Sequence, residues 1–271
     1  MERDVLRKVQ LKQLEIAKEI RRVCEENDIR FFLCCGTFLG AVRHQGFIPW
    51  DDDMDVGMLR EDYERFCRIA PEKMNPRFCV QSWHTESGFA LPYAKVRMRG
   101  TTFLEAKGNL LEENGFYVDV FPFDYAPEAP KAQKWHAVKL ATLFYCRLMK
   151  CGCKPWMEND RISWKKRLGY FLFQVLSLPF SGKALAEKYD ALAKGQPGSR
   201  VLCRQRGLFR LDCYQASWYE KLSNYDFEGE VFPGPENYDA VLTAQFGDYM
   251  TPPPEDKREN RHQVIKLDFG E

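Results

Sequence analysis

The stretch that decides the fold runs from Gly36 to Val56 and reads GTFLGAVRHQGFIPWDDDMDV. If the chain is extended at its end, Asp53 and Asp55 point to one face and the apolar Met54 to the other. Two carboxylates on one strand face are costly without a counter-charge, which a divalent cation supplies. Hard oxygen ligands favour Mg²⁺ or Mn²⁺. The pattern therefore predicts that Asp53 and Asp55 bind a metal ion.

A solvated turn is the alternative, because aspartate-rich stretches also form loops and cap helices. Two features favour the metal site. Gly36 and Thr37 form a predicted tight turn after the apolar run 29–35, and a helix starting there offers backbone N–H groups to a phosphate. Asp119 lies among apolar neighbours, where an unpaired charge is expensive, so a metal shared with Asp53 and Asp55 accounts for it better than a structural role.

Basic side chains are candidates for contacts with an anionic substrate. Lys95, Arg97 and Arg99 alternate on a predicted strand and would share one face. We expect Lys95 and Arg97 to contact a phosphate, although an exposed basic strand face would show the same pattern. Arg43 and His44, between the turn and the acids, are further candidates, and a structural histidine is the alternative for His44.

The pattern of the whole chain predicts an α+β fold, with a mixed sheet flanked by helices and an added helical region. Residues 1–127 form the expected catalytic core, and residues 128–271 form a helical region whose C-terminal segment packs back on the core. Apolar periodicity and turn residues predict the individual elements. Helices are expected at 3–26, 38–43, 61–69 and over much of 130–195, and strands at 29–35, 54–59, 78–82, 93–98, 102–106 and 116–121.

Composition limits the class of protein. Forty Lys and Arg residues balance 39 Asp and Glu residues, which argues against bulk nucleic-acid binding. The N-terminus is charged and unlike a signal peptide, and no apolar run is long enough to span a bilayer. We therefore expect a cytoplasmic protein with mostly reduced cysteines. Cys151, Cys153, Cys203 and Cys213 could hold zinc, but their spacings match no standard pair and favour free thiols.

The central motif resembles the LicD family of phosphorylcholine transferases, which includes the fukutin-related proteins and has the nucleotidyltransferase fold. The segments KVRMRGTT at 95–102, FYVDVFPFD at 116–124 and FPGPENYDAVLTAQFGDYMTPPPEDKR at 232–258 agree with it. Within the last segment, Tyr238, Asp239 and 247–249 match the family's C-terminal motif, for which we favour a packing role.

This resemblance implies a reaction. The family transfers a phospho-group from a CDP-linked donor, such as CDP-choline or a CDP-alditol, to a hydroxyl of a glycan or lipid-linked glycan and releases CMP. Asp53, Asp55 and Asp119 would then bind the catalytic Mg²⁺ or Mn²⁺. A nucleotidyltransferase that releases pyrophosphate and a non-catalytic nucleotide-binding module are the alternatives, and the intact acid set speaks against the binding module. The phospho-group, the acceptor and the oligomeric state stay open.

Residues 164–182 read WKKRLGYFLFQVLSLPFSG, a basic cluster followed by an uncharged apolar stretch. The segment is too short to span a bilayer. A buried helix of the second region is the favoured interpretation. A helix lying on the membrane surface, giving peripheral membrane contact, is the alternative.

Overall fold

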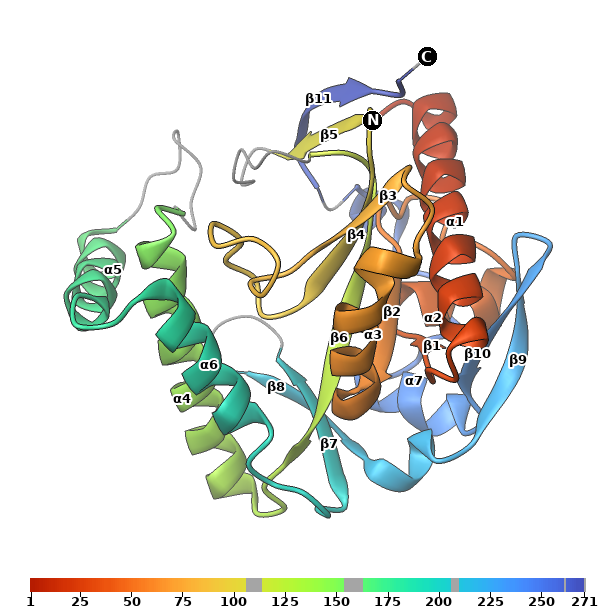
Figure 1. Cartoon of the computed structure of the whole chain (residues 1–271). Helices are drawn as coiled ribbons and strands as arrows, with labels where there is room; N and C mark the ends of the chain where they lie inside the picture. The colour runs from red at the N-terminus through yellow and green to blue at the C-terminus, as the bar shows by residue number, and fades with distance from the viewer. Residues whose placement is uncertain (106–113, 154–162, 206–209, 261, 271) are drawn as a thin grey trace.

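The computed structural model describes residues 1–271 except 106–113, 154–162, 206–209, 261 and 271, and the side chain of Gln205. A seven-stranded mixed sheet forms its centre, with helices on both sides (Figure 1). The predicted α+β class is confirmed. The helices are α1 (Arg3–Glu26), α2 (Cys35–His44), α3 (Arg60–Lys73), α4 (Pro130–Lys150), α5 (Trp164–Ser177), α6 (Gly182–Ala193) and α7 (Tyr238–Phe246).

The strands of the central sheet lie in the order β1-β2-β6-β4-β3, and β7 and β8 extend it from the second half of β6. Only β2 and β6 run parallel, and the other described pairs are antiparallel. The strands of this sheet are β1 (Phe32–Leu33), β2 (Asp55–Leu59), β3 (Phe78–Gln81), β4 (Ala94–Met98), β6 (Tyr117–Ala126), β7 (Val201–Gln205) and β8 (Leu211–Gln215). The predicted boundary at residue 127 falls at the end of β6, and β7 and β8 from beyond it continue the same sheet.

Strand register separates an apolar face of this sheet from a polar one. Val56 and Ala94 flank Val120 on one face, and all three are fully buried. The helices α1 and α3 pack side by side against the sheet, and their apolar residues join one core with these valines. Asp55 and Lys95 flank Asp119 on the opposite face.

The C-terminal quarter packs back on the first part of the chain, as the sequence predicts. The hairpin of β9 (Leu222–Phe227) and β10 (Glu230–Pro235) contacts β1 and α2. Phe38 of α2 meets the Tyr225 ring edge-on at 5.2 Å between centroids. Further on, β11 (Val264–Asp268) pairs with β5 (Thr102–Glu105) in a separate two-stranded sheet.

Several predicted boundaries are wrong, each for a local reason. The strand expected over 29–35 is reduced to Phe32–Leu33, because α2 begins at Cys35. Gly36 and Thr37 therefore lie in the first turn of a helix and not in a tight turn. The α3 helix passes Pro71 and ends at Lys73. The strand β6 continues to Ala126 because β7 pairs with its second half.

The helix α5 corrects the prediction of a buried helix over 164–182. The helix forms, but of its residues only Ser177 is buried, while Tyr170 and Phe173 are partly covered. The apolar side chains Leu168, Phe171 and Leu172 are about half exposed. In the part of the chain that the structure describes, no helix combines the length and the apolar character needed to cross a bilayer.

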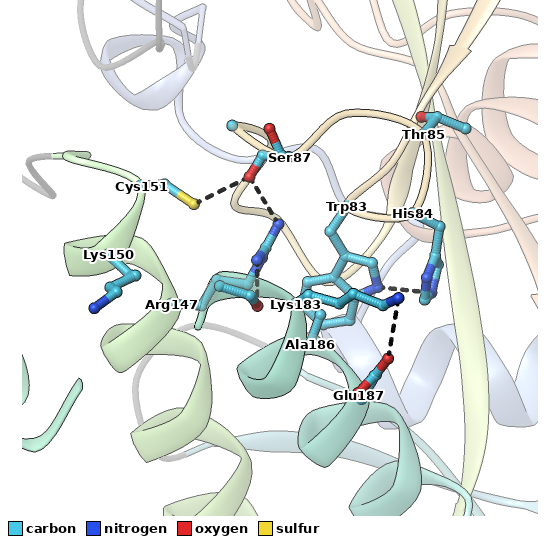
Figure 2. A pocket seen from close by; sticks show the side chains of 12 residues that line it. Trp83, His84, Thr85, Ser87, Arg147, Lys150, Cys151, Lys183, Ala186 and Glu187 are labelled. Carbon is cyan, nitrogen blue, oxygen red and sulfur yellow. Dashed lines mark hydrogen bonds and ion pairs between the residues drawn. The ribbon is translucent and has the colours of Figure 1, made fainter. Parts of the chain in front are cut away.

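Arg147 joins the pieces of the helical region. Its side chain is 1% exposed and donates to the carbonyl oxygens of Gly182 (2.5 Å), Phe89 (2.7 Å) and Ser87 (3.3 Å). Figure 2 shows it between α4, the start of α6 and the loop that carries Ser87. One cation thus satisfies carbonyl groups from two segments distant from α4 in sequence.

We expect Arg147→Met to lower the free energy of unfolding by about 3 kcal/mol, because three carbonyls lose a charged donor while the side-chain volume is kept. Chemical denaturation measures this loss. The control is Lys150→Ala, an exposed change on the same helix and at the same pocket, which should alter stability by less than about 0.5 kcal/mol. Equal effects of both changes would contradict the role of Arg147.

Candidate active site

Asp55 and Asp119 are register partners on the parallel strands β2 and β6. Both side chains are buried, at 7% exposure, and point to the polar face of the sheet. Asp53 precedes β2 and is half-buried. These three predicted ligands interact electrostatically, since the charges of Asp53 and Asp119 both act on the Asp55 carboxyl. The structure therefore pairs Asp55 with Asp119 and leaves Asp53 close enough for its charge to act on both carboxyls.

The N-terminus of α2 positions Asp55. The Asp55 amide donates to Thr37 Oγ1 at 2.8 Å, and the Cys34 amide donates to the Asp55 carbonyl at 3.3 Å. Thr37 is buried, and its hydroxyl accepts this hydrogen bond from the first residue of β2. A Cβ on Gly36 would lie 2.6 Å from Asp51 Oδ2, so the Asp51 carboxylate lies against the first turn of this helix. A side chain at position 36 would therefore displace this carboxylate.

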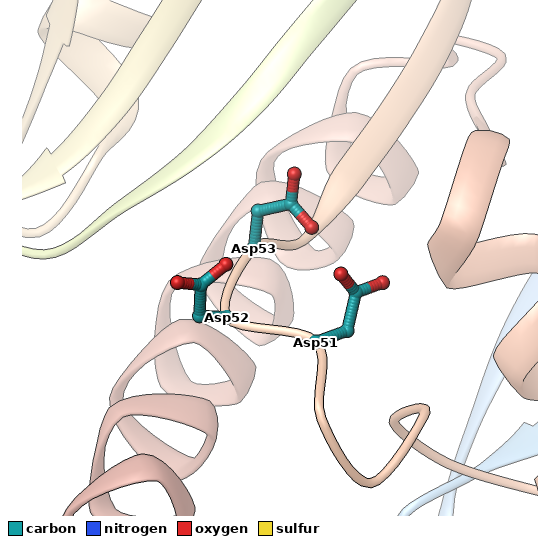
Figure 3. Close-up of side chains that lie close together, drawn as sticks. All are labelled: Asp51, Asp52 and Asp53. Atoms are coloured by element: carbon teal, nitrogen blue, oxygen red, sulfur yellow. The ribbon is translucent and has the colours of Figure 1, made fainter. Parts of the chain in front are cut away.

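The turn that carries the acids is held from distant segments. Asp51, Asp52 and Asp53 offer ligand atoms that all lie within 4.8 Å of one another (Figure 3). Two buried α1 side chains fix its backbone: Gln10 donates to the Asp51 carbonyl at 2.9 Å, and Gln13 to the Asp52 carbonyl at 2.8 Å. The acidic turn is thus anchored to a helix some 40 residues earlier in the chain.

Asp52 is fully buried and pairs with the C-terminal segment. Its Oδ1 lies 2.9 Å from His262 Nδ1, and the His262 amide donates to its Oδ2 at 3.2 Å. Burial lowers the pKa of His262, but the hydrogen bond to Asp52 and the nearby acids Glu105 and Asp53 outweigh this and raise it to about 9. Asp52 therefore has a cationic partner of its own, unlike Asp55.

Burial raises the pKa of Asp55 well above its ordinary value, and repulsion by Asp53 adds to this. Burial also raises the pKa of Asp119, although Lys95 opposes the shift. Lys95 Nζ lies 2.7 Å from Asp119 Oδ1, and this contact lowers the pKa of the carboxyl against the effect of burial. The prediction that Asp119 is unpaired without a metal ion is therefore wrong in part, because Lys95 supplies one counter-charge.

A divalent cation fits this face of the sheet. The set offers hard carboxylate oxygens, and it includes the buried Asp55 carboxyl, whose pKa is raised by burial and by repulsion from Asp53. A cation would replace the missing positive charge and let all the carboxylates ionise. Asp53, Asp55 and Asp119 are the residues that could hold it.

The predicted basic residues divide into two groups. Lys95 lies at the acids and over the Tyr117 ring, with Nζ 3.2 Å from its centroid. Arg97 is buried and bound to Gln81 Oε1 (2.5 Å) and the Gly115 carbonyl (2.7 Å), which gives it a structural role beside the site.

Arg43 and His44 lie at the other end of α2, where their described contacts are with neighbouring segments. Arg43 donates to the Tyr249 carbonyl at 2.6 Å, and the His44 ring meets Trp50 edge-on. Tyr249 in turn donates to Asp239 Oδ1 at 2.8 Å. The C-terminal motif therefore packs against α2, consistent with the role favoured from the sequence.

Arg204 is a basic residue that sequence reasoning missed. It lies on β7 beside Phe123 and Phe121 of β6, hence on the polar face, with its guanidinium over the Phe121 ring. It donates to Asp212 Oδ2 at 3.1 Å, while its buried Nε has no partner among the described residues. Burial lowers the pKa of Arg204, but the opposing effect of Cys35, Cys34 and Asp55 is larger. The pKa of Arg204 is therefore raised overall. No local motif marks Arg204, and only the pairing of β7 with β6 reveals it.

Cys35 is a second residue without a sequence signal. It begins α2 with a φ of 55°, in the left-handed region. A hydrogen bond between the Cys35 and Cys34 thiols and the charge of Arg204 lower the pKa of Cys35 to about 7 against the effect of burial. All ten cysteines are free thiols in the structure. Cys151 and Cys153 lie at the end of α4. Cys203 and Cys213 are register neighbours on the adjacent strands β7 and β8.

We expect His262→Gln to change how stability depends on pH. The folded-state pKa of His262 lies above its unfolded value, so the stabilisation is complete below about pH 6.5 and is lost as the pH rises through about 9. The stability difference between wild type and variant should therefore shrink by about 2 kcal/mol over this window, measured by urea unfolding.

His136→Gln is the control, because burial lowers the pKa of His136 and places its effect below pH 6.5. Its stability difference from the wild type should stay constant over the same window. A constant difference for His262→Gln as well would contradict a charged His262–Asp52 pair.

The sequence of the chain is similar to those of known transferases. Residues 28–145 match the family model LicD/FKTN/FKRP, nucleotidyltransferase domain. The chain is 29% identical to the lipopolysaccharide cholinephosphotransferase LicD of Haemophilus influenzae, over 97% of both chains. It is also 31% identical to the human ribitol 5-phosphate transferase FKRP, over 40% of this chain and 20% of that protein. The matched region contains Asp53, Asp55 and Asp119.

Proposed function

Because residues 28–145 belong to the LicD family and the chain is a LicD-type transferase, we propose that it transfers a phospho-group from a CDP-linked donor to a glycan hydroxyl and releases CMP. The observation that carries the proposal is that the buried carboxyls of Asp55 and Asp119 share the polar face of the sheet and that the charge of Asp53 acts on both. Mg²⁺ or Mn²⁺ is the cofactor that this set of oxygen ligands would hold.

The proposed reaction is a displacement at phosphorus. The acceptor oxygen forms a bond to the phosphorus of the phospho-group, and the bond from that phosphorus to the oxygen of CMP breaks. The bound cation would supply positive charge to the attacking and leaving oxygens. A carboxylate of the acidic set takes the proton of the acceptor hydroxyl.

Two cations support the binding of an anionic donor. Lys95 on β4 and Arg204 on β7 share the sheet face of Asp55 and Asp119, on the two strands that pair antiparallel with β6. Both side chains are largely buried, and a charge in a dry site interacts more strongly than one in water. These positive charges support the binding of a diphosphate beside the carboxylates.

The similarity favours phosphocholine as the first group to test, with an alditol phosphate second. The relative named as a cholinephosphotransferase matches over almost its full length, whereas the ribitol 5-phosphate transferase matches over a fifth of its length. A glycan, free or lipid-linked, is the proposed acceptor.

We expect Asp53→Asn and Asp55→Asn each to lower turnover roughly 100-fold or more, because both remove charge that binds the cation. Purified protein is assayed with CDP-choline and with CDP-ribitol, and the nucleotide product is identified by chromatography. CMP formation supports the proposal, whereas pyrophosphate from a nucleoside triphosphate would identify a nucleotidyltransferase instead.

Asp256→Asn is the matched control, since this aspartate is exposed and lies far along the chain in the 3-10 turn Glu255–Lys257. It should keep wild-type turnover. Near wild-type activity in Asp53→Asn or Asp55→Asn, with the fold intact by circular dichroism, would refute the assignment of these acids.

We expect metal binding to release protons and to weaken as the pH falls. The pKa of Asp55 is raised, so an incoming cation must displace a proton that an ordinary aspartate would already have lost. Titration calorimetry with Mn²⁺ in two buffers of different ionisation enthalpy measures this proton release. Asp55→Asn should remove it and weaken binding at least about tenfold. Binding without proton release in the wild type would contradict the predicted state of Asp55.

A further inference from the structure

The helix α5 carries an exposed apolar surface that the proposed reaction does not use. Eight of the fifteen large hydrophobic side chains that are exposed in the described chain lie within 164–180. Their exposures run from 36% to 69%. They are Trp164, Leu168, Phe171, Leu172, Val175, Leu176, Leu178 and Phe180.

The opposite side of α5 fixes the helix to the protein. The Phe173 and Tyr170 rings lie 5.3 and 6.1 Å from the Tyr145 ring of α4, and Ser177 is 2% exposed. At about 100° per residue, the exposed apolar side chains between 164 and 178 cover an arc of roughly 160° on the other side. The helix therefore has two apolar faces, of which α4 covers one.

The position of α5 leaves the second face open. In Figure 1, α5 lies at the outer edge of the molecule, with α4 and α6 between it and the sheet. Among the described elements its extensive contacts are with α4. Contiguous apolar surface of this kind on a protein marks a place where something else binds.

Charge identifies what binds. Lys165, Lys166 and Arg167 open the helix and are all exposed. On the helical wheel, Lys165 and Arg167 lie at the two edges of the apolar arc. The segment 163–186 contains no aspartate or glutamate. A wide apolar arc bordered by cations is complementary to a bilayer with anionic headgroups, in which the basic groups stay at the headgroups and the apolar groups enter the acyl boundary.

We propose that α5, with Leu178 and Phe180, lies in the surface of an anionic lipid bilayer. Trp164 and Phe171 enter the boundary between headgroups and acyl chains, and Lys165 and Arg167 contact the anionic headgroups. The bilayer covers the face of α5 that α4 leaves open. A protein held in this way can meet an acceptor carried on a lipid, but the contact depends only on α5 and not on the catalytic activity.

The test is sedimentation of the full-length protein with vesicles of phosphatidylcholine, with or without phosphatidylglycerol. Binding to the anionic vesicles is expected, with a loss as salt is added. Trp164→Ser combined with Phe171→Ser should lower the partition coefficient at least about tenfold, because two aromatic side chains that would enter the bilayer are lost. The triple variant Lys165→Gln, Lys166→Gln and Arg167→Gln should lower the partition coefficient at least about tenfold on anionic vesicles.

Trp135→Ser combined with Ile265→Ser is the matched control. Trp135 is 67% exposed against 69% for Trp164, and Ile265 is 63% exposed against 59% for Phe171. This variant should bind vesicles as the wild type does. Melting temperatures of both variants show whether each is folded.

Fluorescence quenching tests the same contact without the serine substitutions, in case these unfold the protein. Brominated lipids should quench the fluorescence of wild-type Trp164, and the quenching should disappear in Trp164→Phe but not in Trp135→Phe. No sedimentation with either vesicle, or equal losses in both serine variants, would overturn the proposal. A third outcome would also overturn it. In that case light scattering shows that the wild type is a dimer, the Trp164→Ser, Phe171→Ser variant is a monomer, and neither protein binds vesicles. None of these outcomes depends on turnover, so they leave the proposed reaction to its own test.

Discussion

Asp55 and Asp119 are register partners on parallel strands, so their buried carboxylates share one face of the sheet and repel each other. The opposite face around Val56, Ala94 and Val120 packs against α1 and α3 in the apolar core. Strand alternation therefore confines the acids, with Lys95 and Arg204, to the polar face. The proposed cation site and the raised pKa of Asp55 both follow from this division of the sheet.

The surroundings of the site come from the ends of the chain. Gln10 and Gln13 of α1 bind the backbone of the acidic turn, and His262 pairs with Asp52. Each contact satisfies a polar group that is buried. The turn between α2 and β2 thus has a defined position although it belongs to neither element. The two chain ends supply the site's support, while the central motif supplies its acids.

The sequence predicted the elements with clear periodicity and missed those whose limits depend on partners. The helix 3–26 was found to the residue because its apolar face repeats over six turns. The run 29–35 was expected as one strand, but only Phe32 and Leu33 find a partner in β2. A short apolar run satisfies a strand and a helix start equally, so local pattern alone does not distinguish them. For the same reason the apolar pattern of α5 did not show which of its faces is covered.

What the sequence by itself determined is the chemistry of the central motif. The spacing of Asp53 and Asp55 predicts one shared face for an extended chain, and an acid in the apolar run 116–121 calls for a counter-charge. The pairing of β2 with β6 decided that Asp119 joins the face of Asp55. Only the tertiary structure decided which basic side chains lie on that face. Arg204 lies there because β7 pairs with β6, and Lys95 lies there because β4 pairs with β6. It also assigned Arg97, Arg43 and Thr37 to contacts that hold the fold. The physical reason is that alternation along a strand is local, whereas strand neighbours are chosen by packing across the whole chain.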